Sequence, residues 1–221
     1  MLVVKTKKKV AKKVAKKIVV VDKLSKIVDT EIIVILDRSG SMQLVKSDME
    51  GGFDNWIRLQ RELDIPGKCL VSLAEFNTGG VRYVYESLPL NDVPYLMLEP
   101  MGGTPLLDAV GEVVTRAVSR LTNSKSRVLC VILTDGQENS SITWKKDQVK
   151  KLITDQQSKG WEFVFLGVGI DAFAEANVMG IAMGQTLSTA AGPAGVQTAF
   201  AALNTSSKSY RSGGSSSPIN P

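Results

Sequence analysis

Short apolar runs alternate with longer amphipathic stretches along most of the chain. Residues 32–36 are all aliphatic, and Asp37 ends the run, which is the pattern of a strand buried on both faces. Apolar runs at 70–76 and 81–88 flank the turn residues 77–80 (Asn-Thr-Gly-Gly), which predicts a hairpin and an antiparallel strand at a sheet edge. Later apolar runs predict three more strands, at residues 128–134, 163–168 and 185–188.

Stretches with apolar residues at helical spacing lie between these runs. They predict helices at residues 42–63, 105–121, 144–158, 171–179 and 194–203. The pair Gly51-Gly52 weakens the middle of the first of these helices. Strand and helix alternate in the second half of the chain, which is typical of βαβ units. The pattern therefore predicts an α/β domain with a mostly parallel sheet.

Both ends of the chain differ in composition from its middle. Eight lysines lie between Lys5 and Lys17, before the first acidic residue, and the apolar residues among them recur at four-residue spacing. Residues 206–221 are rich in serine and glycine. We therefore expect a basic, flexible N-terminal arm at residues 1–28, one domain at residues 29–205, and a disordered tail at residues 206–221.

The basic character of the chain belongs to this arm. The sequence has 27 Lys and Arg against 22 Asp and Glu, a net charge of +5, and without the eight lysines from Lys5 to Lys17 only 19 basic residues remain against the 22 acidic ones. The folded part is thus mildly acidic. Two interpretations of the arm stay open: a solvated tail, or an anion-seeking segment that binds nucleic acid or a membrane surface. No aromatic residue interleaves the arm lysines, which disfavours base stacking there.

Histidine is absent from the sequence. Its absence removes the usual general base, the Ser-His and Cys-His nucleophile pairs and imidazole-based zinc sites, so the common hydrolytic chemistries are disfavoured. Cys69 and Cys130 lie inside apolar runs, and we expect buried, reduced thiols. We find no signal-peptide pattern and no apolar stretch near the roughly 20 residues of a membrane span, so we expect a cytoplasmic protein.

Three polar loops carry the candidate chemistry. They are residues 37–41 (Asp-Arg-Ser-Gly-Ser), residues 102–105 (Gly-Gly-Thr-Pro) and residues 134–136 (Thr-Asp-Gly). Each follows a predicted strand or opens a predicted helix. In an open α/β sheet, ligands bind beyond the carboxyl ends of the strands, where the winding reverses direction. Asp37 and Asp135 would face each other there if their two strands are neighbours.

The donor atoms of these loops indicate which ion they would hold. Carboxylates and hydroxyls are hard oxygen donors, so we expect Mg²⁺, with Mn²⁺ or Ca²⁺ as alternatives. Magnesium keeps several waters and needs only a few protein ligands. With neutral hydroxyls around it, an open position on the ion would favour an incoming carboxylate, which suggests a docking point for a partner.

Each loop also has a plain structural explanation. Ser39 or Ser41 would cap the following helix, Thr104 would be the N-cap before a first-turn proline, and Asp135-Gly136 would be a turn. We prefer the metal site because all three loops occur together, in this order and at element boundaries. Arg38 and residues 137–141 stay open as either the rim of the docking face or solvated loops.

The three loops resemble the metal-ion-dependent adhesion site of von Willebrand factor A domains. The pattern of that site is Asp-x-Ser-x-Ser, followed by a distant Thr and a distant Asp. All five positions are filled here, by Asp37, Ser39, Ser41, Thr104 and Asp135. The resemblance runs from residue 30 to residue 203, and the sequences around the five positions are typical of the prokaryotic branch of the family.

The resemblance implies a fold and a set of ligand roles. The fold would be a doubly wound, Rossmann-like sheet of six strands, mostly parallel with one antiparallel edge strand, and with helices on both faces. Ser39, Ser41 and Thr104 would be direct metal ligands, and Asp37 and Asp135 would act directly or through water. Intracellular relatives commonly work in assemblies, which implies a protein partner that presents an Asp or Glu carboxylate.

We therefore predict a non-enzymatic, metal-ion-dependent protein-binding module within an intracellular assembly. One alternative is a nucleic-acid-associated scaffold that uses the lysine-rich arm. A second is a metal-dependent phosphatase of the haloacid dehalogenase type, which also begins with an Asp after the first strand. That chemistry needs a second acid two residues later, where this chain has Ser39. A GxxxxGK[ST] phosphate loop is also absent from the sequence, which disfavours nucleotide hydrolysis.

Overall fold

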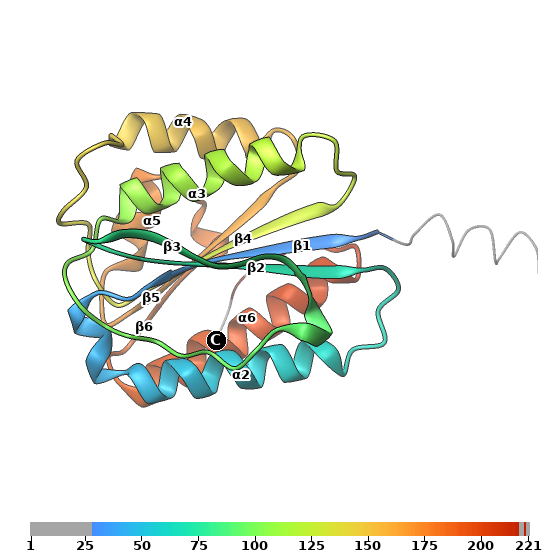
Figure 1. Cartoon of the computed structure of the whole chain (residues 1–221), viewed down its shortest axis with the longest axis horizontal. Helices are drawn as coiled ribbons and strands as arrows, with labels where there is room; N and C mark the ends of the chain where they lie inside the picture. The colour runs from blue at the N-terminus through green and yellow to red at the C-terminus, as the bar shows by residue number, and fades with distance from the viewer. Residues whose placement is uncertain (1–27, 217–218, 220–221) are drawn as a thin grey trace, which may run out of the picture.

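The computed structural model describes residues 28–216 and residue 219, which form one sheet covered by helices on both faces (Figure 1). The strands are β1 (Thr30–Asp37), β2 (Cys69–Asn77), β3 (Gly80–Pro89), β4 (Arg127–Thr134), β5 (Glu162–Val168) and β6 (Thr186–Thr189). Their order across the sheet is β3-β2-β1-β4-β5-β6. All neighbours are parallel except β2 and β3, which form the expected hairpin at one edge.

The helices fill two layers. They are η1 (Gly40–Leu44), α2 (Lys46–Arg61), η2 (Leu90–Asp92), α3 (Leu106–Leu121), α4 (Lys146–Gln157), α5 (Ala172–Val178), η3 (Met183–Gln185) and α6 (Pro193–Arg211). Figure 1 shows α2 and α6 on one face of the sheet and α3, α4 and α5 on the other. The structure therefore confirms the doubly wound α/β fold, with six strands and a single antiparallel edge strand.

Strand β1 shows why the two layers form. Ile32, Val34 and Leu36 point into the core shared with α2 and α6, whereas Ile33 and Ile35 point into the core shared with α3 and α4. All five side chains are at most 1% exposed. A strand with both faces buried must be apolar at every position, which accounts for the uninterrupted run in the sequence.

The chain order of the strands creates a switch point beside β1. From β1 the chain first builds β2 and β3 on one side, and then returns to place β4, β5 and β6 on the other side. Leu36 of β1 pairs with Leu133 of β4, so the residues that follow each strand emerge next to each other. Asp37 and Asp135 are therefore brought to the same edge by topology alone.

The expected first helix at residues 42–63 is shorter than predicted. Its first turn is a separate 3-10 helix, η1, and α2 begins at Lys46. Val45 separates the two with backbone angles outside the helical region. The break lets the chain turn out of the loop after Asp37, a constraint that helical periodicity does not reveal.

The expected end of the domain at residue 205 requires a correction. Helix α6 continues to Arg211, and Ser206, Ser207 and Tyr210 within this extension are buried. The serine-rich composition predicts a low-complexity tail here, but the hydroxyls of Ser206 and Ser207 are used inside the fold. The Ser207 Oγ donates to the Leu203 carbonyl at 2.6 Å and accepts from the Trp56 indole at 3.0 Å.

The two ends of the chain and the two cysteines complete the comparison with the sequence. The basic arm at residues 1–28 lies outside the described residues except for its last position, and so do four positions of the tail. Cys69 and Cys130 are buried and unbridged, as expected. Within the described part of the chain, no helix is both long and apolar enough to cross a membrane.

Candidate metal centre

The predicted site begins where β1 ends. Asp37 is the last residue of the strand, and its side chain folds back so that Oδ1 accepts a hydrogen bond from the Ser39 amide at 2.7 Å. This bond fixes the start of the loop and orients the carboxylate toward it. Asp37 is 0% exposed and Ser39 is 2% exposed, so both lie at the floor of the site.

Hydroxyl groups connect this loop to the end of β4. The Ser39 and Ser41 hydroxyls are 3.0 Å apart and share a hydrogen bond. The Ser41 Oγ donates to Asp135 Oδ1 at 2.7 Å. Four of the five predicted residues thus form one continuous hydrogen-bonded chain, although Ser41 and Asp135 are 94 positions apart in the sequence.

Thr104 completes the set from a third loop. Its backbone amide donates to Asn139 Oδ1 at 2.9 Å, which holds the loop in place. A Cβ added at Gly136 would lie 2.7 Å from Thr104 Oγ1 and 3.5 Å from Asp37 Oδ2. Thr104 and Asp37 therefore flank the same small space, and Gly136 keeps that space open because it has no side chain.

The Thr104 hydroxyl has no hydrogen-bond partner among the described residues. Helix α3 begins at Leu106, and no side chain caps it from the N-cap position Pro105. The proposed capping role of Thr104 is therefore wrong, and Ser39 likewise makes no side-chain cap to η1. Thr104 and Ser39 are each 2% exposed, yet neither hydroxyl caps a helix.

Backbone contacts fix the loops relative to each other. The Gly40 amide donates to the Gly102 carbonyl at 2.9 Å, and the Met101 amide donates to the Arg38 carbonyl at 2.9 Å. Gly102 has a φ of +77°, a conformation that side-chain-bearing residues rarely adopt. The glycine-rich sequence before Thr104 is therefore needed to bring this loop against the loop after β1.

The two carboxylates lie in an environment that opposes their negative charge. Burial raises the pKa of Asp37 to about 6, although hydrogen bonds from Thr134 and Ser39 act in the opposite direction. Burial also raises the pKa of Asp135. Among the described residues, no cationic side chain forms an ion pair with either group. A buried carboxylate without a cation is costly, so a bound cation would stabilise this arrangement.

The donor set fits a hard divalent ion. The described residues contain no group of three or more His, Cys, Asp or Glu that could hold a metal. A metal in this site would thus depend on hydroxyl oxygens in addition to Asp37 and Asp135. An all-oxygen set with few charged members is typical of magnesium sites and excludes the usual thiolate and imidazole zinc sites.

The structure also adds supporting residues that the sequence analysis missed. The Thr134 Oγ1 donates to Asp37 Oδ2 at 2.6 Å and so holds the second carboxylate oxygen. Glu138 Oε2 accepts from the Leu107 amide at 2.8 Å, and thereby closes the start of α3. The hydroxyl residue directly before Asp135 was the signal for the first of these contacts. Nothing local in the sequence indicates the second.

These contacts also change the interpretation of residues 137–141 and of Arg38. Glu138 and Asn139 hold α3 and Thr104, so this segment supports the site instead of forming a free rim or a solvated loop. The Arg38 guanidinium reaches the Glu99 carbonyl and Asn77 Oδ1, each at 3.4 Å. These two distances are long for hydrogen bonds, so Arg38 is only loosely held beside the site.

Comparison with known proteins agrees with this geometry. No protein-family model and no curated protein sequence matches the chain. Among solved structures, proximal thread matrix protein 1 from the mussel byssus, in a form with a zinc-occupied MIDAS motif, superposes with a TM-score of 0.60 at 17% identity, over 80% of this chain and 47% of that chain. The von Willebrand factor type A structure from Catenulispora acidiphila gives a TM-score of 0.56 at 17% identity, over 82% and 43%.

A third structure, the manganese-loaded TRAP protein of Plasmodium vivax, gives a TM-score of 0.51 at 14% identity, over 73% of this chain and 68% of that chain. The present chain spans less than half the length of the first two structures. Identities this low establish the fold and nothing further. The chain has the fold of a von Willebrand factor A domain.

Proposed function

We propose that this chain is a non-enzymatic, metal-ion-dependent protein-binding domain. The observation that carries the proposal is the fully buried carboxylate of Asp37, which has no cationic partner among the described residues and faces the unused hydroxyl of Thr104. A divalent cation between these loops would satisfy both groups. The zinc-occupied and manganese-loaded structures with the same fold support a metal at this edge of the sheet.

The ion we propose is Mg²⁺, with Mn²⁺ or Ca²⁺ as alternatives. Ser39, Ser41 and Thr104 would be its direct ligands, and Asp37 and Asp135 would act directly or through water. When bound, the ion supplies an electrophilic position for an anionic group. Where Asp37 and Asp135 act through water, only neutral hydroxyls contact the ion directly, so the bound ion would keep part of its positive charge. A carboxylate of Asp or Glu on a partner protein is the matching group.

The site offers little for catalysis. Histidine is absent from the chain, and Ser39 occupies the position where a haloacid dehalogenase-type phosphatase needs a second acid. The hydroxyls of Ser39 and Ser41 are hydrogen-bonded to each other and to Asp135, with no general base beside them other than these carboxylates. We therefore propose binding, in a cytoplasmic assembly of the kind found in the prokaryotic branch, as the role of the site.

Metal titration tests the first half of the proposal. Isothermal titration calorimetry with Mg²⁺, Mn²⁺ and Ca²⁺ should show one site in the wild type. Thr104→Val should weaken metal binding at least about 10-fold, a loss of about 1.4 kcal/mol. The change keeps the side-chain shape and removes a hydroxyl with no hydrogen bond, so the fold should persist. Asp92→Asn, in the exposed turn η2, is the matched control and should bind metal like the wild type.

The same variants test the partner. Affinity capture from a native lysate, with magnesium and again with chelator, should retain partners only on the wild type and Asp92→Asn in magnesium. Replacing an exposed acidic residue of a retained partner by its amide should release it. Identical partner sets for wild type and Thr104→Val, or equal capture with chelator, would show that the site is not used for docking. Equal metal affinity in the two proteins would refute the site itself.

A further inference from the structure

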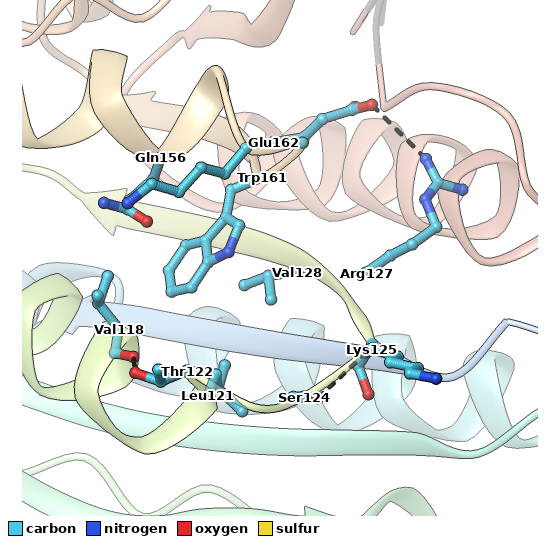
Figure 2. Close-up of a pocket in the computed structure, with 13 residues that line it drawn as sticks. Val118, Leu121, Thr122, Ser124, Lys125, Arg127, Val128, Gln156, Trp161 and Glu162 are labelled. Carbon is cyan, nitrogen blue, oxygen red and sulfur yellow. Dashed lines mark hydrogen bonds and ion pairs between the residues drawn. The ribbon is translucent and has the colours of Figure 1, made fainter.

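A second pocket lies at the opposite end of the sheet from the metal centre. It has a volume of about 840 Å³ and lies between the ends of α3 and α4 and the starts of β4 and β5 (Figure 2). This volume falls within the range of small-molecule sites in proteins. The residues that matter for its chemistry are Val118, Leu121, Lys125, Gln156, Lys159 and Trp161.

Gln156 is the first sign that this pocket is built for a ligand. Val149, Ile153 and Gln156 form the buried stripe of α4, at the spacing of a helix face that packs on a sheet. Gln156 is 4% exposed, and its side-chain amide has no hydrogen-bond partner among the described residues, yet it is not one of their fully buried unpartnered polar groups, so the small exposed part of Gln156 includes its amide. The amide therefore faces the solvent in the pocket that Gln156 lines, at a position of the buried stripe where an apolar residue would serve packing alone.

Trp161 supplies a flat apolar surface beside this amide. Its ring stacks on Phe163 with centroids 6.3 Å apart and an interplanar angle of 28°. Figure 2 shows the indole under α4, on the same side of the pocket as Gln156, with Val118 and Leu121 of α3 and the following Thr122 across from it. Within the described part of the chain, the indole N–H also has no acceptor. The pocket therefore combines a ring surface with unused donors and an unused acceptor.

Two lysines give the pocket an unbalanced positive charge. Lys125 and Lys159 line it, and neither forms an ion pair or a hydrogen bond with the described residues. The third cation, Arg127, is already used elsewhere: it donates to the Tyr210 and Gly214 carbonyls at 2.6 Å each and lies 3.7 Å from Glu162, which balances its charge. The lining groups thus carry a net charge of +2.

Lysines near helix C-termini ordinarily interact with the partial negative charge of the terminal carbonyl groups. The hydrogen bonds made by these carbonyls argue against that explanation here. The final carbonyls of α4 already accept backbone amides: Gln156 O from Trp161, and Gln157 O from Gly160. At the end of α3, Leu121 O accepts from the Ser124 amide. With these carbonyls satisfied, the lysine ammonium groups stay available for an external anion.

We propose that this pocket binds a nucleoside monophosphate. The planar base would lie against Trp161, the donor and acceptor of the Gln156 amide would read one edge of the base, and Lys125 and Lys159 would hold the phosphate. An amide matches the adjacent donor and acceptor on a base edge such as that of adenine. Stacking on an aromatic ring and a lysine-bound phosphate are the other usual elements of nucleotide recognition. The proposal is independent of the metal centre.

Titration with AMP, followed by NMR of the tryptophan indole N–H groups, tests this proposal. The Trp161 signal, assigned with Trp161→Phe, should shift on addition of AMP, whereas the signal of the deeply buried Trp56 should not. Adenosine and inorganic phosphate should each bind at least about 10-fold more weakly than AMP, because each lacks one half of the contacts. Absence of a Trp161 shift with AMP, or equal binding of adenosine, would overturn the proposal.

Variants separate the two halves of the site. Gln156→Leu should weaken AMP binding about 10-fold, and the protein should stay folded because an apolar side chain of similar size suits the buried stripe of α4. Lys125→Ala with Lys159→Ala should also weaken AMP binding about 10-fold and reduce its salt dependence. The pair Lys150→Ala with Lys151→Ala removes the same charge from α4 outside the pocket and should bind AMP like the wild type. Unchanged affinity in Gln156→Leu, or equal losses in both lysine pairs, would refute the assignment.

Discussion

At the scale of single residues, Asp37 gives the metal centre a measurable dependence on pH. Its pKa is raised from 3.8 to about 6 by burial, so the metal-free fold favours the protonated form. Burial of the neutral Asp37 carboxyl therefore contributes fully to the stability of the metal-free protein below pH 3.8. This contribution is lost as the pH rises through 6, where the carboxyl ionises. Metal-free wild type should therefore lose up to about 3 kcal/mol between these limits relative to Asp37→Asn, which does not titrate.

Urea unfolding in chelator at acidic and neutral pH measures this difference. The amide of Asp37→Asn can still accept from the Ser39 amide, so the variant should fold and should be the more stable protein at neutral pH. Saturating magnesium should reverse the order, because only the carboxylate gains from the ion. If the free energy of unfolding of the two proteins changed with pH in parallel, Asp37 would not be a group whose pKa is raised by burial.

The candidate ligand residues could each be picked out from the sequence, whereas most of the residues that hold them in place could not. Asp37 directly follows an apolar run, which indicates the end of a buried strand. Thr134 also lies at a strand end, but a hydroxyl there has many ordinary roles. Glu138 accepts from the amide of Leu107, 31 positions earlier in the chain, a contact that depends on the three-dimensional path of the loop. The local sequence pattern indicates the oxygen-bearing candidate ligands. The residues that hydrogen-bond to them and hold their loops are found only in the three-dimensional structure.

At the scale of elements, the two glycines in the middle of α2 have different roles. A Cβ at Gly52 would lie 2.3 Å from the ring of Phe200 on α6, whereas a Cβ at Gly51 would meet nothing within 4 Å. Gly52→Ala should destabilise the protein by roughly 1–3 kcal/mol through overpacking. Gly51→Ala should stabilise it by about 0.5–1 kcal/mol, because alanine is the better helix former.

Denaturant unfolding of the two variants separates packing from helix propensity, since both make the same chemical change one residue apart. Equal effects would show that α2 and α6 do not approach through Gly52. The sequence predicted only a weakened helix at this pair. The close contact between helices distant in the chain is the physical reason why one of the two glycines is needed.

The errors at element ends have a similar cause. Ser206 and Ser207 were assigned to a disordered tail because serine-rich segments usually lack a core. In the fold, the Ser206 Oγ donates to the Ser216 carbonyl at 2.6 Å, and the Trp56 indole bonds to Ser207. These small hydroxyls allow α6 to pack closely on α2. Composition gives no indication of such partners, because they lie on another helix or beyond the turn.

At the scale of the whole molecule, the alternation of strands and helices predicted a mostly parallel sheet, and the candidate metal ligands could be brought together on the condition that the strands before Asp37 and Asp135 are neighbours. The site could be located because parallel strands send their carboxyl ends to one edge, and the switch point lies beside β1. The nucleotide pocket could not be located this way. It depends on Gln156 and Trp161 meeting at the amino ends of β4 and β5, where no sequence motif marks a ligand.

The separation of the two sites leads to a final prediction about stability. Strand β4 spans Arg127–Thr134, about 25 Å at roughly 3.3 Å per residue, and it separates the pocket from the metal centre. Changes this far apart should act independently. Magnesium at 100 times its dissociation constant should raise the free energy of unfolding by about 2.7 kcal/mol in the wild type. Gln156→Leu should keep this full gain, whereas Asp37→Asn should lose it. Calorimetric melting with and without magnesium measures both, and a reduced gain in Gln156→Leu would reveal coupling through the sheet.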